Sequence, residues 1–217
     1  MSRDALDSLA EYGVVPVIAI ERVEWALPLA DALIAGGLPL AEITFRTQAA
    51  SAVLELLAAE RPDLLLGAGT VLTPEHAQRA KDCGAAFAVA PGLNPAVVER
   101  AGEIGLPFMP GIQNPTDIET ALALDCRRLK YFPAEASGGI RYLKAIAAPY
   151  LHTGVQFMPT GGVDAANLDG YLALPAVLAC GGTWLAGPAD LAAGNWQAIT
   201  DRCREAASIV ARDRALK

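Results

Sequence analysis

The stretch Val14–Gly37, VVPVIAIERVEWALPLADALIAGG, decides the fold that this sequence predicts. Its start, Val14–Ile20, is an apolar, β-rich run typical of a buried strand. Val23–Ala35 then repeats apolar residues at helical spacing and stops at Gly36 and Gly37, a common helix ending. A strand followed by a helix is the unit of right-handed βαβ crossovers, so a chain built of such units predicts a parallel sheet.

The same unit recurs along the chain and predicts eight strands, each followed by a helix. The expected strands are 14–20, 40–44, 64–68, 87–90, 108–110, 128–132, 156–158 and 177–180. The expected helices are 23–35, 49–60, one opening at Thr73–Pro74, 94–105, 115–125, 139–148, 165–172 and 196–211, with a short N-terminal helix at 5–12. These units fit a closed (β/α)8 TIM barrel, an α/β fold of one domain over residues 1–217. The alternative, an open doubly wound sheet, more often carries a GxGxxG motif after its first strand, and this sequence has none there.

Composition narrows the class of partner and the compartment. The chain has 217 residues, 53% of them hydrophobic, with a formal net charge of −7 and a pI near 4.8. This acidic balance argues against nucleic acid and anionic membrane surfaces as partners. The N-terminus has no apolar signal-peptide core, and no apolar run approaches ~18 residues, so we expect a cytoplasmic protein.

Residues that commonly bind metals are sparse and scattered. His76 and His152 are the only two histidines, too few for a histidine-held catalytic metal, and no carboxylate set stands at ligand spacing. The cysteines form no CxxC pair, so we expect free, buried thiols at Cys83, Cys126, Cys180 and Cys203. The sequence therefore predicts an enzyme or binding protein that uses neither a metal nor a cofactor.

Polar residues at the carboxyl ends of the expected strands are the functional candidates, because active sites of this fold lie at that face. Glu42, Thr44 and Arg46 alternate along the second strand and its exit, so they face one side. One interpretation is a structural ion pair between Glu42 and Arg46. The other gives Glu42 proton transfer and Arg46 a bidentate hold on a substrate carboxylate.

Three strand ends are rich in glycine. Gly67–Thr70, GAGT, offers a ligand close approach to the backbone and a hydroxyl on Thr70. Thr160–Gly162 and Gly181–Thr183 end the seventh and eighth strands, where backbone N–H groups of this fold frequently bind phosphate. Two ordinary turns are the alternative for these two segments.

Lys130 stands in the short apolar run Leu129–Phe132, which Pro133 stops. A lysine among large apolar residues either extends its amine to water or is held inside. If it is held inside, burial favours the uncharged, nucleophilic amine. Together with an acid/base, a carboxylate clamp and a phosphate site, this lysine indicates a Schiff-base enzyme for a phosphorylated 2-oxo acid.

Seven motifs carry a resemblance that covers nearly the whole chain. In order they are EITFRT (42–47), GAGTVL (67–72), APGLNP (90–95), PGI (110–112), KYFPAEASGG (130–139), PTGGV (159–163) and GGTWL (181–185). In this order and spacing the sequence resembles the class I 2-keto-3-deoxy-6-phosphogluconate aldolases, and the lysine block is the most specific part. Two positions depart from the family pattern: Thr183 stands where serine is frequent, and Phe45 where an aliphatic residue is usual.

The resemblance implies reversible cleavage of 2-keto-3-deoxy-6-phosphogluconate to pyruvate and glyceraldehyde 3-phosphate, often with cleavage of 4-hydroxy-2-oxoglutarate, by a homotrimer. It implies that Lys130 forms the Schiff base and that Glu42 moves protons. Arg46 and Thr70 are the implied carboxylate ligands. The full set of expected substrate-binding residues is Arg46, Thr70, Pro91, Phe132, Thr160, Gly161, Gly162, Gly181, Gly182 and Thr183.

Other functions remain open at this point. A sister family cleaves the galactonate epimer and shares the lysine, the glutamate and GAGTVL, but it tends to lack the arginine of FRT and the PAEASGG run, both present here. A metal-dependent aldolase would lose activity to a chelator. A non-catalytic phosphosugar-binding barrel would bind phosphate without turnover.

Overall fold

The computed structural model describes residues 5–215. The strands are β1 (Val14–Ile18), β2 (Leu40–Thr44), β3 (Leu65–Gly69), β4 (Phe87–Val89), β5 (Phe108–Met109), β6 (Gly111–Ile112), β7 (Arg128–Tyr131), β8 (Gln156–Pro159) and β9 (Cys180–Gly182). The α-helices are α1 (Ala5–Tyr12), α2 (Ala26–Ala35), α3 (Ala50–Glu60), α4 (Pro74–Asp82), α5 (Pro95–Glu103), α6 (Pro115–Ala123), α7 (Gly139–Ala147), α8 (Leu168–Leu172), α9 (Pro188–Ala193) and α10 (Trp196–Ala215). Short 3-10 helices are η1 (Val23–Trp25), η2 (Ala148–Thr153) and η3 (Trp184–Ala186).

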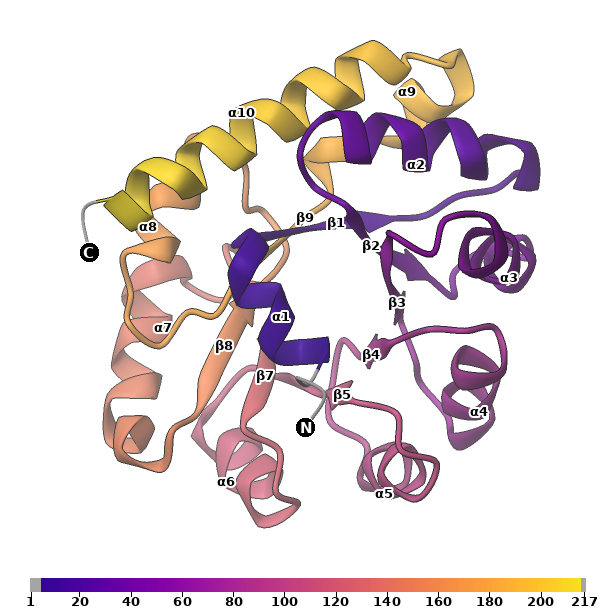
Figure 1. The fold of residues 1–217 in the computed structure, drawn as a ribbon. Helices are drawn as coiled ribbons and strands as arrows, with labels where there is room; N and C mark the ends of the chain where they lie inside the picture. Colours follow the sequence, from indigo (N-terminus) through magenta and orange to yellow (C-terminus); the bar gives the residue numbers. More distant parts are fainter. Residues whose placement is uncertain (1–4, 216–217) are drawn as a thin grey trace.

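The strands pair in parallel and curl round a common centre, with α2 to α8 and α10 outside them (Figure 1). They form a six-stranded sheet in the order β5-β4-β3-β2-β1-β9 and a three-stranded sheet in the order β6-β7-β8. Single parallel bridges, Phe157 to Val177 and Thr160 to Gly181, connect β8 to the segment that holds β9. The predicted α/β class with a curled parallel sheet is confirmed. Regular pairing within residues 5–215 is divided between the two sheets.

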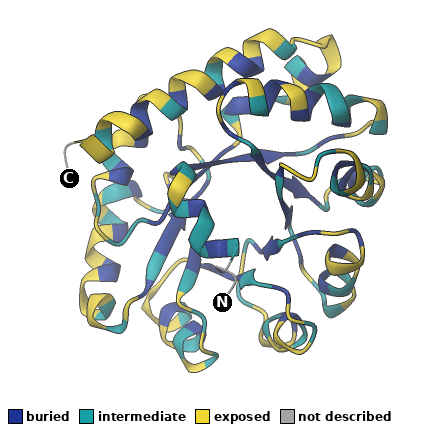
Figure 2. Cartoon of the chain, viewed as in Figure 1, coloured by how far each residue is buried: buried dark blue, intermediate teal, exposed yellow. Residues whose placement is uncertain are grey.

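Burial explains why the strand sequences are almost continuously apolar. Every residue of β1 and β2 is buried, because helices cover one side of the sheet and side chains fill the other. Figure 2 shows the same pattern across the molecule, with buried strands at the centre and exposed residues on the outer faces of the helices. α1 lies across the ring of strands, at the end where β1 begins (Figure 1).

Three helices begin at polar caps followed by proline. The Thr73 hydroxyl accepts a hydrogen bond from the His76 N–H at 3.2 Å, and Asn94 accepts from the Ala96 N–H at 3.1 Å. Asn114 caps α6 in a capping box with Asp117. Each cap accepts a hydrogen bond from an N–H that the first helical turn leaves unpaired. Proline has no N–H, so it fits the first helical position, where an N–H would have no partner within the helix. The helix start predicted at Thr73–Pro74 is confirmed.

Two predicted strands differ from the structure. The strand expected at 108–110 is divided into β5 and β6 by Pro110, which has no N–H for a sheet ladder. The strand expected at 177–180 instead spans Cys180–Gly182, because these residues pair with β1. Because glycine is depleted in strands, local propensity does not predict a strand at Gly181 and Gly182. α9 was not predicted, although Pro188 directly after Gly187 is a helix-start signal.

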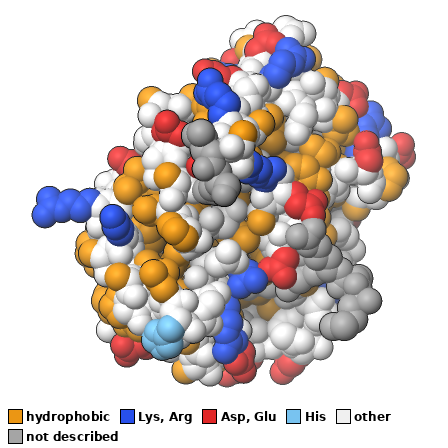
Figure 3. All heavy atoms as spheres, turned by 60° about the vertical axis from the view of Figure 1, so that its left-hand side comes forward, with side chains coloured by type: hydrophobic (Ala, Val, Ile, Leu, Met, Phe, Trp, Pro, Cys, Tyr) orange, Lys and Arg blue, Asp and Glu red, His pale blue; other side chains and the backbone are white. Residues whose placement is uncertain are grey.

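The outer surface has one apolar depression beside α7. It has a volume of about 160 Å³ and is lined mainly by side chains of α7, η2 and residues 174–177, with Leu151 52% exposed. Figure 3 shows apolar side chains gathered on the side of the molecule that carries α7 and α8. Among residues 5–215, a helix with the length and apolarity of a bilayer span is absent.

Gly67→Ala tests the packing inside the ring of strands. A Cβ at Gly67 would lie 2.2 Å from the Phe87 ring, which is fully buried and unable to move away. We expect the variant to lose about 1–3 kcal/mol of unfolding free energy in urea denaturation. The control Gly102→Ala meets nothing within 4 Å and lies inside α5, so it should gain about 0.5–1 kcal/mol. Equal stabilities of the two variants would contradict this packing.

Candidate active site

A buried ion pair links two strands that belong to different sheets. Lys130 Nζ on β7 donates hydrogen bonds to Glu42 Oε1 at 3.0 Å and Oε2 at 3.3 Å on β2. The side chain of Lys130 is 6% exposed and that of Glu42 is 1% exposed. The sequence predicted both residues as functional, and the structure brings them together across 88 positions of the chain. The interpretation of Lys130 as an extended, solvated lysine is wrong.

Small residues make room for this pair. A Cβ at Gly69 would lie 2.3 Å from Glu42 Oε1, so glycine at this position of β3 is what allows the glutamate to extend inward. The sequence predicts that the glycine-rich stretch Gly67–Thr70 leaves space for a ligand. Instead, the Phe87 ring fills the space at Gly67 and the Glu42 carboxylate fills that at Gly69. Its glycines therefore shape the site through protein packing.

Phe132 adjoins both the lysine and one of the glycine loops. Its ring centroid lies 5.8 Å from Lys130 Nζ, within the range of a cation–π contact. Gly161 packs against the Phe132 ring and against Pro133, with 3.3 Å left for a Cβ. The aromatic ring thus lies near the lysine amine and in contact with Gly161.

Arg46 and Thr70 leave neighbouring strands at the same level. Thr44 pairs with Gly69, and the Phe45 N–H donates to the Gly69 carbonyl at 2.8 Å. The segments that follow β2 and β3 are therefore still adjacent where they leave the sheet. Arg46 is exposed, and none of the hydrogen bonds or ion pairs found in residues 5–215 includes its guanidinium. The alternative of a Glu42–Arg46 ion pair is wrong, because Glu42 pairs with Lys130.

Thr70 has a backbone conformation that is rare for its type. Its φ is +58°, in the left-handed region that a β-branched residue enters at a cost of about 1–3 kcal/mol. Such strain persists where the surrounding structure enforces it, and it clusters at ligand sites. Thr44, the third residue of the predicted polar face, has its hydroxyl occupied: it donates to the Ile18 carbonyl at 3.1 Å.

The two glycine loops lie side by side and present free amides. Thr160 forms its bridge with Gly181, and a Cβ at Gly181 would strike the Thr160 hydroxyl at 2.2 Å. The carbonyls of Gly161 and Gly162 accept hydrogen bonds from the Glu135 N–H and from Asn167 Nδ2, each at 3.0 Å. Within residues 5–215, no hydrogen bond uses the N–H of Gly161, Gly162 or Thr183. The loops therefore leave these three donors unpaired while the carbonyls of Gly161 and Gly162 are paired, an arrangement that suits an anion.

The remaining predicted residues lie at the edge of this group. Gly182 packs directly on the Trp184 ring, where a Cβ would lie 2.1 Å from a ring carbon. Pro91 packs its backbone against Gly111, which pairs with Lys130 in the sheet. Thr183 is exposed, and its side chain makes no hydrogen bond within the described chain. Within residues 5–215, none of these three residues forms a hydrogen bond with Lys130 or Glu42 through its side chain.

Glu135 and Tyr171 were not predicted as site residues. The Tyr171 hydroxyl donates a hydrogen bond to Glu135 Oε1, and Tyr171 is fully buried. Burial and this hydrogen bond raise the pKa of Tyr171 well above its usual range, so it is a permanent donor. Glu135 lies in the PAEASGG motif, which is the one signal in the sequence that could have identified it. Its partner, Tyr171, lies 36 positions further along the chain and belongs to no motif.

The described residues contain no group of three or more His, Cys, Asp or Glu side chains placed to hold a metal ion. Cys83, Cys180 and Cys203 are buried free thiols, as predicted, while Cys126 is only half-buried. Burial raises the pKa of the Cys203 thiol to about 12, so it stays protonated and unreactive.

Comparison with known proteins agrees with the geometry. A family model described as KDPG and KHG aldolase matches residues 6–202. A 2-dehydro-3-deoxy-phosphogluconate aldolase from Haemophilus influenzae is 44% identical over 96% of this chain and 98% of its own length. One from Treponema pallidum is 46% identical over 94% of this chain and 96% of its own. The crystal structure of KDPG aldolase from Legionella pneumophila, with pyruvate captured at low pH as a covalent carbinolamine intermediate, matches with a TM-score of 0.89 and 38% identity, over 94% of this chain and 98% of that one.

Removing one partner of the buried pair should cost far more stability than removing both. Lys130→Met or Glu42→Met leaves an unpaired buried charge, and we expect each to lose about 3 kcal/mol of unfolding free energy. The double variant should recover most of this loss, which a double-mutant cycle in urea measures.

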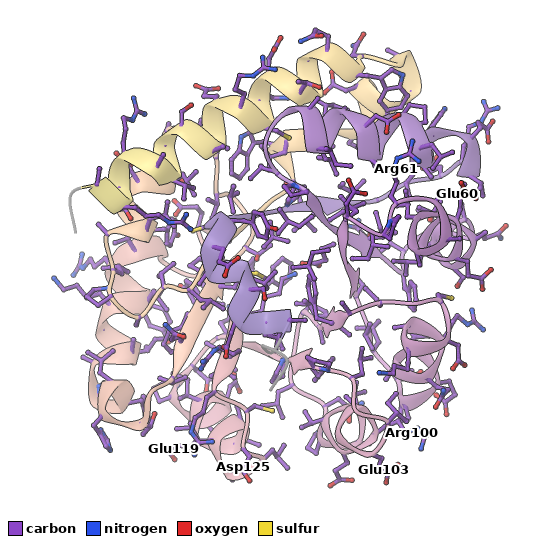
Figure 4. All side chains as sticks on the ribbon, in the orientation of Figure 1. Glu60, Arg61, Arg100, Glu103, Glu119 and Asp125 are labelled. Carbon is purple, nitrogen blue, oxygen red and sulfur yellow. The ribbon has the colours of Figure 1, made fainter. Side chains whose placement is uncertain are left out.

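The matched control is an exposed ion pair. Arg100 and Glu103 on the outer side of α5 (Figure 4) lie 2.9 Å apart, and their methionine variants should show a coupling below about 1 kcal/mol. Additive losses at Lys130 and Glu42 would contradict the buried pair.

Proposed function

This chain belongs to the KDPG and KHG aldolase family, and we propose that it is a Schiff-base aldolase that cleaves 2-keto-3-deoxy-6-phosphogluconate to pyruvate and glyceraldehyde 3-phosphate. Cleavage of 4-hydroxy-2-oxoglutarate is part of the proposal, because the matching family model describes KHG aldolases as well as KDPG aldolases. The observation that carries the proposal is the buried Lys130–Glu42 pair, an amine within 3.0 Å of a proton acceptor.

We infer that one (β/α)8 barrel holds this site. β5 and β6 together serve as one strand interrupted at Pro110, which leaves eight strands in the ring. The Lys130 N–H donates to the Pro110 carbonyl at 2.8 Å, and the Thr160–Gly181 bridge joins the other edge of the three-stranded sheet to β9. These contacts support closure, and the single hydrophobic core supports one domain over residues 1–217.

The reaction begins with transfer of the lysine proton to Glu42. The neutral Lys130 amine then attacks the C2 carbonyl carbon of the substrate. Glu42 gives its proton to the carbonyl oxygen and takes one from the nitrogen, which leaves a neutral carbinolamine and a protonated Glu42. Loss of water, with a proton supplied from Glu42, gives the iminium. Glu42 is the group to carry these protons, since its carboxylate touches Nζ and is sealed from bulk water.

The iminium draws electrons from the bond between C3 and C4. When Glu42, directly or through a water, removes the proton of the C4 hydroxyl, that bond breaks and C4 leaves as the aldehyde of glyceraldehyde 3-phosphate. The electron pair remains on C3 as an enamine, which takes a proton to give the pyruvate iminium. Water then releases pyruvate and frees Lys130.

Anion contacts fix the two ends of the substrate. The exposed Arg46 guanidinium and the Thr70 hydroxyl, at the ends of adjacent strands, are proposed to bind the carboxylate. The free amides of Gly161, Gly162 and Thr183, with Gly182 beside them, are proposed to bind the phosphate. Phe132, Pro91 and Thr160 line the space between these two anions. The cytoplasmic location and the homotrimer expected from the sequence stay predictions.

Borohydride trapping tests the nucleophile. Reduction in the presence of pyruvate should add one covalent pyruvate-derived group, which peptide mapping assigns to Lys130. Lys130→Met should abolish the adduct, while Lys144→Met, which removes an exposed lysine of α7, should retain it. Trapping that survives Lys130→Met would overturn the mechanism. Phosphate binding without trapping would favour a binding protein, and activity lost to a chelator and restored by a divalent ion would favour a metal-dependent aldolase.

Two charge variants separate proton transfer from binding. Glu42→Gln keeps the shape but removes the base, so kcat should fall about 10²- to 10⁴-fold with little change in KM. Arg46→Ala removes a carboxylate ligand that makes no internal contact, so KM should rise at least about tenfold. Arg100→Ala on the outer side of α5 is the control. Kinetics of both variants equal to those of the control would return Glu42 and Arg46 to a structural role. Assays with the galactonate epimer distinguish the sister activity.

A further inference from the structure

We propose that Glu135 and Tyr171 form a clamp that positions the phosphate-binding amides of Gly161 and Gly162. The two residues follow different strands: Glu135 lies in the loop after β7, and Tyr171 lies on α8 after β8. Neither touches the reacting atoms in the proposed mechanism, so they are positioning residues. The inference rests on the proposed function and deepens it, because it concerns how the chain selects a phosphorylated substrate.

The first step of the argument is the contact between the two loops. The Ala134 N–H donates to the Thr160 carbonyl at 2.8 Å, and the Glu135 N–H donates to the Gly161 carbonyl at 3.0 Å. These bonds extend the pairing of β7 and β8 beyond the strands. They also hold the Gly161 carbonyl, whose partial negative charge would repel a phosphate, on the side of Glu135.

The second step is the position of the Glu135 side chain. Its Cβ and Cγ pack on Gly162, where a Cβ would lie 2.6 Å from Glu135 Cβ, and Gly162 has a φ of +83°. A side chain at Gly162 would therefore be excluded twice, by its backbone conformation and by the Glu135 stem. The stem of Glu135 thus presses directly on the residue whose N–H is free.

The third step is the direction of the carboxylate. A Cβ at Gly139, the first residue of α7, would lie 3.0 Å from Glu135 Oε1 and 3.5 Å from the Tyr171 hydroxyl. The carboxylate is thus directed to the start of α7, where the helix dipole favours negative charge, and accepts the tyrosine hydroxyl there. The Glu135 carboxylate therefore lies away from the free amides, while its Cβ and Cγ atoms pack against Gly162.

The clamp predicts a selective kinetic effect. Tyr171→Phe removes the hydroxyl that donates to the Glu135 carboxylate. Water can then hydrogen-bond to the freed carboxylate oxygen, since Glu135 is exposed. We expect KM for 2-keto-3-deoxy-6-phosphogluconate, and the inhibition constant of inorganic phosphate, to rise about tenfold, the value of one charge-assisted hydrogen bond. The kcat and the rate of borohydride trapping with pyruvate, which carries no phosphate, should stay within about twofold.

A second tyrosine–glutamate pair provides a matched control. Tyr150 donates to Glu119 Oε1 at 2.9 Å, and Glu119 lies on the outer surface of α6 (Figure 4). Tyr150→Phe deletes the same atom from the same kind of hydrogen bond and should change none of these quantities. Glu135→Gln keeps the stem and an acceptor oxygen, although its neutral hydrogen bond is weaker, and should restore part of the phosphate affinity that Glu135→Ala loses.

The outcomes separate this inference from the proposed function. If Tyr171→Phe slows pyruvate trapping as much as it weakens phosphate inhibition, or leaves phosphate inhibition unchanged, the clamp is overturned while the aldolase stands. If the unaltered protein cleaves no keto sugar acid, the proposed function fails. Calorimetric titration with inorganic phosphate then still decides the clamp, by comparing the Tyr171→Phe and Tyr150→Phe proteins.

Discussion

The buried ion pair between Lys130 and Glu42 is the interaction on which the rest of the site depends. Taking both charges out of water costs several kcal/mol per ion, and only their mutual attraction offsets this cost. The fold supplies the geometry: β2 and β7 face each other across the ring, and Gly69 clears the space that the carboxylate occupies. Such a pair is poorly suited to stability alone. Its burial, which seals both groups from bulk water, makes it suited to moving a proton between carboxylate and amine.

The ion pair also explains why the proposed anion sites use groups other than Lys130. Because Glu42 balances the charge of Lys130, little positive charge remains at the centre to hold two anionic substrate groups. In the proposed function, Arg46 beyond the end of β2 and the free amides after β8 and β9 supply that attraction. An acidic protein of net charge −7 thus offers an anion local donors without a basic surface.

The sequence predicted the strand–helix units and the strand ends well, because apolar periodicity and caps such as Thr73–Pro74 are local signals. It failed where partners distant in the chain decide the structure. β9 pairs through glycines that no propensity favours, and Gly67 and Gly69 serve Phe87 and Glu42 instead of a ligand. The Lys130–Glu42 contact joins residues 88 positions apart, so sequence could name both residues but not their bond.

Glu135 shows how one anionic residue can serve an anion site. Its charge would repel a phosphate if the carboxylate faced the free amides of Gly161 and Gly162. The start of α7 and the Tyr171 hydroxyl instead hold the carboxylate on the far side of its own stem. A neutral residue of the same length would fill the space, but it would be held less firmly, because hydrogen bonds to charged groups are roughly twice as strong as neutral ones. The negative charge of Glu135 therefore makes the loop more rigid. The carboxylate is oriented away from the free amides, so it does not repel the phosphate.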